Sequence, residues 1–266
     1  MRLLLALLLT LATPALACGP DSDCPVGDRI YRIAMPEGWD GNSMVPAVVW
    51  SHGYRGSAAG VMRNGSMRRM LSDAGYALIA AQGVNGSWDL PFGPRTFDST
   101  GAAEFAYFEA VLEDAAQNHH IDPARIIASG FSAGGMMVWN LACARPGLFA
   151  GFIPYSGTFW LKPPDACAAP VASIVHIHGT QDETVPLKGR PIGETHQGEV
   201  EEALSMYETF GGFGASAYYK IGPLTCRNRS NAGGETLQLC LFEGGHSFRT
   251  EFLGHGINEL VEAGQL

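Results

Sequence analysis

Segments with the apolar pattern of β-strands alternate along the chain with segments that have the pattern of α-helices. Nearly continuous apolar runs at 45–50 (VPAVVW), 76–81 (YALIAA) and 173–178 (SIVHIH) are typical of strands buried on both faces of a parallel sheet. Segment 29–35 (RIYRIAM) alternates polar and apolar residues, which predicts a strand with one solvated face. Further strands are predicted just before Ser132, at 149–155 and at 237–242, and helices at 58–74, 102–119, 198–210 and 248–262. This order predicts an α/β fold with a doubly wound, mostly parallel sheet.

The first 17 residues have a different pattern from the rest. Arg2 precedes an apolar run over 3–11, and 14–17 (PALA) fits a small-residue cleavage site. The run is shorter than the roughly 20 residues of a membrane-spanning helix. We therefore predict a signal peptide over 1–17 and one catalytic domain over 18–266, without a large cap domain. The protein is expected to be secreted or periplasmic, with lipid attachment at Cys18 as the alternative.

The charge of the chain disfavours one class of partner, and its cysteines favour disulfides over a metal site. The chain has 17 Lys and Arg against 26 Asp and Glu, a net charge of −9, which disfavours nucleic acid as a partner. An even number of cysteines behind an export signal predicts disulfides rather than a metal site, and no Cys-x-x-Cys motif suggests otherwise. The sequence leaves the connectivity open, and we favour the sequential pairs Cys18–Cys24, Cys143–Cys167 and Cys226–Cys240.

The segment 130–134 (GFSAG) carries the first candidate for chemistry. It lies between a short apolar run and the apolar segment 136–142, so it predicts a strand, a sharp turn and a helix. A serine at such a turn projects its hydroxyl beyond the sheet edge, and the two glycines leave room for the tight crossing. The helix that opens after Ser132 directs free N–H groups, including that of Ala133, at an oxyanion. Ser132 is therefore the predicted nucleophile.

A serine nucleophile needs a base and an acid, and both should follow strands, because the carboxyl ends of parallel strands meet at one edge. Asp182 comes shortly after the 173–178 strand and His246 after the 237–242 strand. The order Ser132, Asp182, His246 is that of the α/β-hydrolase plan. Other acidic and histidine residues are weaker candidates, among them Glu183, which should be solvated, Asp165, His196 and His255, and His176 and His178, which are expected to be structural.

The loops after two other strands supply the remaining candidates. In the glycine-rich loop 51–57, the Tyr54 N–H is the predicted second oxyanion donor, and His52 is expected to hold the loop. Trp88 lies in the long loop 82–100, where it either lines a pocket or anchors the loop to the body. Trp160, after the 149–155 strand, is a second candidate for substrate binding.

Four motifs together resemble one group of α/β-hydrolases, the secreted esterases related to polyhydroxybutyrate depolymerases and feruloyl esterases. They are Ser-His-Gly-Tyr-Arg-Gly-Ser, Gly-Phe-Ser-Ala-Gly-Gly-Met-Met, His-Gly-Thr-Gln-Asp-Glu-Thr-Val-Pro and Gly-Gly-His-Ser-Phe, in that order. The resemblance implies an ester hydrolase with the triad Ser132, Asp182 and His246, with oxyanion donors at Tyr54 and Ala133, and without a cofactor or metal.

The sequence departs from the depolymerase pattern at two places. Two functions other than ester hydrolysis also stay open. Depolymerases commonly have Cys at the position of Tyr54 and a Trp-rich motif where Gly86-Ser87-Trp88 stands here, so we expect a soluble ester or oligomer as substrate. The alternatives are a serine peptidase of the same fold and an exported binding protein that has lost catalysis. The oligomeric state does not follow from the sequence.

Overall fold

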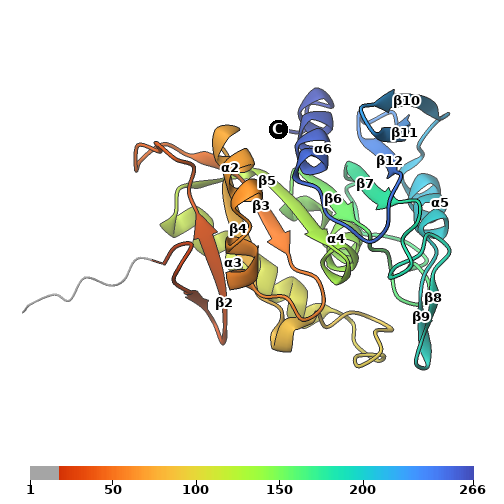
Figure 1. Cartoon of the computed structure of the whole chain (residues 1–266), viewed down its shortest axis with the longest axis horizontal. Coiled ribbons are helices and arrows are strands. Elements are labelled where there is room, and N and C mark those ends of the chain that lie inside the picture. Colours follow the sequence, from red (N-terminus) through yellow and green to blue (C-terminus); the bar gives the residue numbers. More distant parts are fainter. Residues whose placement is uncertain (1–17) are drawn as a thin grey trace, which may run out of the picture.

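The computed structural model describes residues 18–266 and consists of one large twisted sheet with helices on both faces (Figure 1). The six central strands, from β4 to β12 in spatial order, run parallel, and the strands outside them are antiparallel to their neighbours. This confirms the predicted fold class. In spatial order the strands are β1 (Cys24–Val26), β2 (Arg29–Ala34), β4 (Ala77–Ala81), β3 (Val45–Ser51), β5 (Ile121–Phe131), β6 (Gly151–Tyr155), β7 (Ile174–Gly179), β12 (Thr236–Phe242), β11 (Leu224–Ser230) and β10 (Ala217–Ile221).

Alternate residues of the central strands pack against different sets of helices. Ala47 and Val49 of β3 belong to the core beneath one set, and Val48 and Trp50 belong to the core beneath the other. Both faces of the sheet are therefore dry, as the continuous apolar runs predict. The first set is α3 (Ala102–Asn118), α4 (Ala133–Ala144) and α5 (Val200–Gly211), and the second is α1 (Ala58–Met62), α2 (Gly65–Asp73) and α6 (Thr250–Glu262).

The single helix predicted over 58–74 is wrong, because the structure divides it into α1 and α2. The break comes at Arg63 and Asn64, where the Asn64 side chain accepts a hydrogen bond from the Met67 N–H at 3.1 Å. An asparagine side chain that caps a helix in this way favours a new N-terminus over continuation of the preceding helix. The elements that were not predicted from the sequence are the strands β1, β10 and β11, the small hairpin of β8 (Arg190–Ile192) and β9 (Thr195–Gln197), and two short 3₁₀ helices, η1 (Val84–Gly86) and η2 (Pro146–Leu148).

The three disulfides have the predicted sequential connectivity. Cys226 and Cys240 face each other across the β11 and β12 ladder, so this bond joins the two strands directly. The bond from Cys143, near the end of α4, to Cys167 fastens the loop that follows β6. The third bond, Cys18–Cys24, lies at the start of β1.

The predicted signal peptide over 1–17 lies outside the described residues. No helix among residues 18–266 has the length and apolar character needed to cross a membrane.

The sheet reverses its winding between β3 and β5, and this positions the site. From β3 the chain passes through α1 and α2 to β4 on one side, and then through α3 back to β5 on the other side of β3. The loops that leave the carboxyl ends of β3 and β5 therefore diverge, which opens a crevice of the kind that binds ligands in doubly wound folds.

Candidate active site

Ser132 occupies a strained turn between β5 and α4. Its backbone has φ 61° and ψ −121°, a conformation that a residue with a side chain rarely adopts. Its N–H donates to the Tyr155 carbonyl oxygen at 2.9 Å, which ties the turn to β6. A Cβ at Gly130 would lie 2.7 Å from the Ser51 carbonyl oxygen, and one at Gly134 would overlap that same oxygen. The two glycines thus allow β3 to pass close against the turn that exposes Ser132.

Asp182 and His246 form a hydrogen-bonded pair at the ends of β7 and β12. His246 Nδ1 lies 2.7 Å from Asp182 Oδ2, and the Asp182 side chain is fully buried. Asp182 Oδ1 accepts the backbone N–H groups of Thr184 at 2.9 Å and Val185 at 2.8 Å. Burial opposes the charge on this carboxylate, but the hydrogen bonds from His246 and the Val185 N–H outweigh it and lower the pKa of Asp182. Glu183, one position on, is exposed.

The loops that carry Asp182 and His246 are hydrogen-bonded to each other, and the second contacts the residue before Ser132. The Gln181 N–H donates to the Gly244 carbonyl oxygen at 2.8 Å. The His246 ring lies 4.5 Å, centroid to centroid, from the ring of Phe131, the residue before Ser132. Among residues 18–266, the hydrogen bond given for the His246 ring is the one to Asp182, and none joins the ring to the Ser132 hydroxyl. Such bonds are often long in unliganded serine hydrolases and shorten when substrate binds.

The loop after β3 passes directly over Ser132. A Cβ at Gly53 would lie 3.5 Å from Ser132 Cβ, so the backbone that leads to Tyr54 borders Ser132. In the described part of the chain, the N–H groups of Tyr54 and Ala133 donate to no protein acceptor. Both are therefore free to donate to a ligand oxygen.

His52 holds this loop in place. Its Nε2 accepts the Gly83 N–H at 3.0 Å, so the ring proton is on Nδ1, which lies 2.8 Å from the Gly53 carbonyl oxygen. Burial lowers the pKa of His52 and keeps the ring neutral. The predicted loop-holding role thus has a direct geometric basis.

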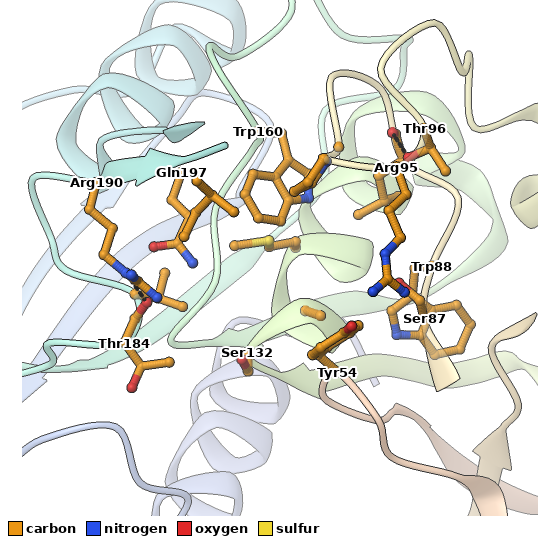
Figure 2. A pocket seen from close by; sticks show the side chains of 17 residues that line it. Tyr54, Ser87, Trp88, Arg95, Thr96, Ser132, Trp160, Thr184, Arg190 and Gln197 are labelled. Carbon is orange, nitrogen blue, oxygen red and sulfur yellow. Dashed lines mark hydrogen bonds between the residues drawn. The ribbon is translucent and has the colours of Figure 1, made fainter. Parts of the chain in front are cut away.

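A cavity of about 390 Å³ opens above Ser132 (Figure 2). Trp88 and Trp160 both contribute to its wall. Trp88 has a second function, because its indole N–H donates to the His52 carbonyl oxygen at 2.8 Å and only 4% of the residue is exposed. Trp88 therefore lies in the cavity wall and also anchors its loop to the backbone of His52. Among the described residues that line the cavity, the charged ones are Arg95 and Arg190, which flank Ser132 in Figure 2.

Comparison with known proteins agrees with this geometry. The model of the Phospholipase/Carboxylesterase family matches residues 99–201. An acetyl xylan esterase from Aspergillus awamori superimposes with a TM-score of 0.62 at 14% identity, over 96% of this chain and 98% of that one. Esterase PE8 gives a TM-score of 0.57 at 19% identity, over 87% and 97% of the two chains. The chain adopts the α/β-hydrolase fold.

Two curated proteins show how far the similarity extends in sequence. NocK of Nocardia uniformis subsp. tsuyamanensis, whose name describes an esterase, is 29% identical over 60% of this chain and 47% of its own. Feruloyl esterase C of Emericella nidulans is 26% identical over 62% of this chain and 58% of its own. The matched region thus spans about half the length of these relatives, and the identities are modest.

The β8 and β9 hairpin forms a part of the cavity wall that was not predicted from the sequence. It contributes Arg190, Ile192 and Gln197 to the wall. The signal was present in Gly193-Glu194, a two-residue connection between short segments, with Gly193 at φ 60°. Strands of three residues are too short for their alternation to be recognised, and only such a turn could have indicated them.

Two groups of side chains in the described residues have the composition of a metal site, His119 with Cys18 and Cys24, and His255 with Cys226 and Cys240. In each group the two cysteines are joined in a disulfide. Metal binding by cysteine requires the thiolate, which a disulfide does not offer.

Proposed function

We propose that this α/β-hydrolase is an exported serine esterase that cleaves carboxylic esters through an acyl-serine intermediate. The observation that carries the proposal is the buried Asp182–His246 hydrogen bond beside the strained turn of Ser132, on the floor of an apolar cavity. The similarity to esterases supports the reaction class.

The mechanism follows from where the protons lie. Asp182 accepts the Nδ1–H of His246, so Nε2 is left as the acceptor that faces the nucleophile. His246 Nε2 takes the proton of Ser132 as its oxygen attacks the ester carbonyl, and the free N–H groups of Tyr54 and Ala133 stabilise the oxyanion. When the tetrahedral intermediate collapses, the alcohol leaves with the proton that His246 had taken from Ser132, and the acyl group stays on Ser132. Water then gives a proton to His246 and attacks the acyl-serine, and His246 returns that proton to Ser132 as the carboxylic acid leaves.

The cavity favours a soluble ester with a compact apolar or aromatic group. Its volume, about 390 Å³, lies in the range of small-molecule sites, and two indoles form part of its wall. Short-chain acyl, hydroxyalkanoate oligomer and feruloyl esters all fit this description. Initial rates on a panel of the three classes would rank them, and equal activity on all three would contradict selection by the cavity.

Export is supported by the three disulfides, which form and persist in oxidising compartments. The bond to Cys24 occupies the Cys18 sulfur, which attachment of a lipid would require. Secretion without a lipid anchor is therefore the form we propose, and mass spectrometry of the mature protein tests it.

Replacement of the nucleophile tests the function itself. Ser132→Ala should lower turnover of a chromogenic short-chain ester by about 10⁴-fold or more, because triad members act as a unit. The exposed Ser205 on α5 is a matched control, and Ser205→Ala should retain wild-type turnover.

An organophosphonate should add its mass to the wild type and to Ser205→Ala but not to Ser132→Ala. Near wild-type turnover in a folded Ser132→Ala would refute the mechanism. A wild type that neither turns over nor is labelled would favour a binding protein, and cleavage of a matched amide as fast as the ester would favour a peptidase.

A further inference from the structure

A buried chain of hydrogen bonds leads from α4 to the loop of Asp182, and its histidines have no step in the mechanism above. Trp139 Nε1 lies 2.9 Å from His176 Nδ1, and His176 Nε2 lies 2.9 Å from His178 Nδ1. His178 Nε2 is 2.7 Å from the Val185 carbonyl oxygen and 3.5 Å from Asp182 Oδ2. Trp139, His176 and His178 are all fully buried. We call this series the Trp139–Val185 chain.

The two ends of the Trp139–Val185 chain fix the position of every proton in it. The indole N–H can only donate, so His176 Nδ1 accepts and its proton is on Nε2. His176 Nε2–H then donates to His178 Nδ1, which places the His178 proton on Nε2. At the far end, the Val185 carbonyl can only accept, and it requires this same proton on Nε2. Burial lowers the pKa of both imidazoles, which agrees with two neutral rings.

The Trp139–Val185 chain ends on the turn 182–185, the turn that also hydrogen-bonds the Asp182 carboxylate. His178 holds the carbonyl of Val185, while the N–H of Val185 and that of Thr184 donate to Asp182 Oδ1. The His178 Nε2–H also faces Asp182 Oδ2, the oxygen that receives His246. A change in either histidine would therefore displace the carboxylate that orients the base.

We propose that His176 and His178 are positioning residues, which hold Asp182 in register with His246 through fixed Nε2–H tautomers. The inference rests on the proposed esterase function. It predicts that loss of one N–H at the far end of the chain, in α4, slows the chemical step while leaving substrate binding intact, because Trp139 does not line the cavity.

Trp139→Phe removes that N–H and keeps an aromatic ring. Its matched control is Tyr207→Phe, because Tyr207 packs edge-on against Trp139 at 6.1 Å and its hydroxyl hydrogen-bonds the Ala172 backbone, outside the Trp139–Val185 chain. We expect Trp139→Phe to lower kcat about tenfold, as a small misplacement of catalytic groups does, with KM within about twofold. Tyr207→Phe should leave both within about twofold. Loss of stability alone would affect the two variants alike.

Nitrogen NMR of ¹⁵N-histidine-labelled wild type reads the tautomers directly and does not depend on whether a variant folds. We expect Nε2–H for both His176 and His178 at pH 7. An Nδ1–H tautomer or a protonated ring at either position would overturn the inference, and so would an unchanged kcat in folded Trp139→Phe. If the wild type hydrolyses no ester, the proposed function fails first. An active wild type with the wrong tautomers defeats this inference alone.

Discussion

Asp182 and Glu183 are adjacent carboxylates after β7, and burial separates their roles. Asp182 is enclosed and hydrogen-bonded to His246, whereas Glu183 is exposed. Asp182→Asn should therefore leave a folded enzyme whose imidazole tautomer is no longer enforced, and turnover near pH 7 should fall by about 10⁴-fold, as in other triads. Glu183→Gln should alter turnover by less than about threefold, since an exposed charge away from the chemistry has little effect. Steady-state rates of both variants on one soluble ester check this, and the reverse order of losses would transfer the acid role to Glu183.

The residues of the site differ in how far the sequence reveals them. Ser132, Asp182 and His246 are predictable because each follows a strand at the edge where parallel strands end, and their order along the chain gives a second criterion. The Trp139–Val185 chain is different, because the contact between Trp139 and His176 depends on how α4 lies on β7. No local sequence pattern encodes that placement. The sequence therefore predicts only that His176 and His178 are structural, and not which residues they contact.

At the scale of elements, the break between α1 and α2 leads to a prediction about stability. The Asn64 side chain accepts the Met67 N–H at the start of α2, so Asn64→Ala should lower the free energy of unfolding by about 1 kcal/mol. Asn258, exposed within α6, is the control, because an alanine there is a better helix former and should not destabilise. Urea unfolding of both variants measures the difference, and equal stabilities would mean that Asn64 contributes no cap.

Long periodic elements were predictable, and short or edge elements were not. The strands at 45–50 and 173–178 agree with β3 and β7 because burial on both faces leaves an uninterrupted apolar run. β10 (AYYKI) lies at the sheet edge with most residues exposed, so its composition is not constrained by a core. The division of the 58–74 helix was missed for a related reason, because one capping asparagine reverses a pattern that otherwise favours continuation.

At the scale of the whole molecule, the site depends on both layers of helices. The core beneath α3, α4 and α5 contains Trp139 and part of the cavity wall, including Trp88 and Val185. The core beneath α1, α2 and α6 supports β3 and, through Phe248, the loop of His246. The sequence predicts this layered plan because its alternation of strands and helices extends through most of the chain. It does not predict the cavity, whose wall joins the segments that follow β3, β4, β5, β6 and β7 with the β8 and β9 hairpin.

The buried histidines make the stability of the whole domain dependent on pH. Burial lowers the pKa of His52, His176 and His178, so the folded protein keeps them neutral as the pH falls through about 6.5, where the unfolded chain takes up protons. Proton uptake by the unfolded chain alone favours unfolding, and stability must fall as the pH falls. Asp182, whose pKa is lowered, adds stability that is lost only near and below about pH 4.

Between pH 7.5 and 5.5 we therefore expect the free energy of unfolding to decrease as the pH falls, by at most about 1.4 kcal/mol for each histidine that stays neutral in the folded protein. Urea unfolding with the disulfides intact, at several pH values in this window, measures the slope. His119 and His255, whose pKa burial also lowers, contribute to the same slope. His176→Gln removes one of these groups and should make the slope shallower, whatever it does to stability at pH 7.5. A flat profile in the wild type, or an unchanged slope in the variant, would show that these imidazoles accept protons in the folded state, which the donor at Trp139 Nε1 forbids for His176 Nδ1.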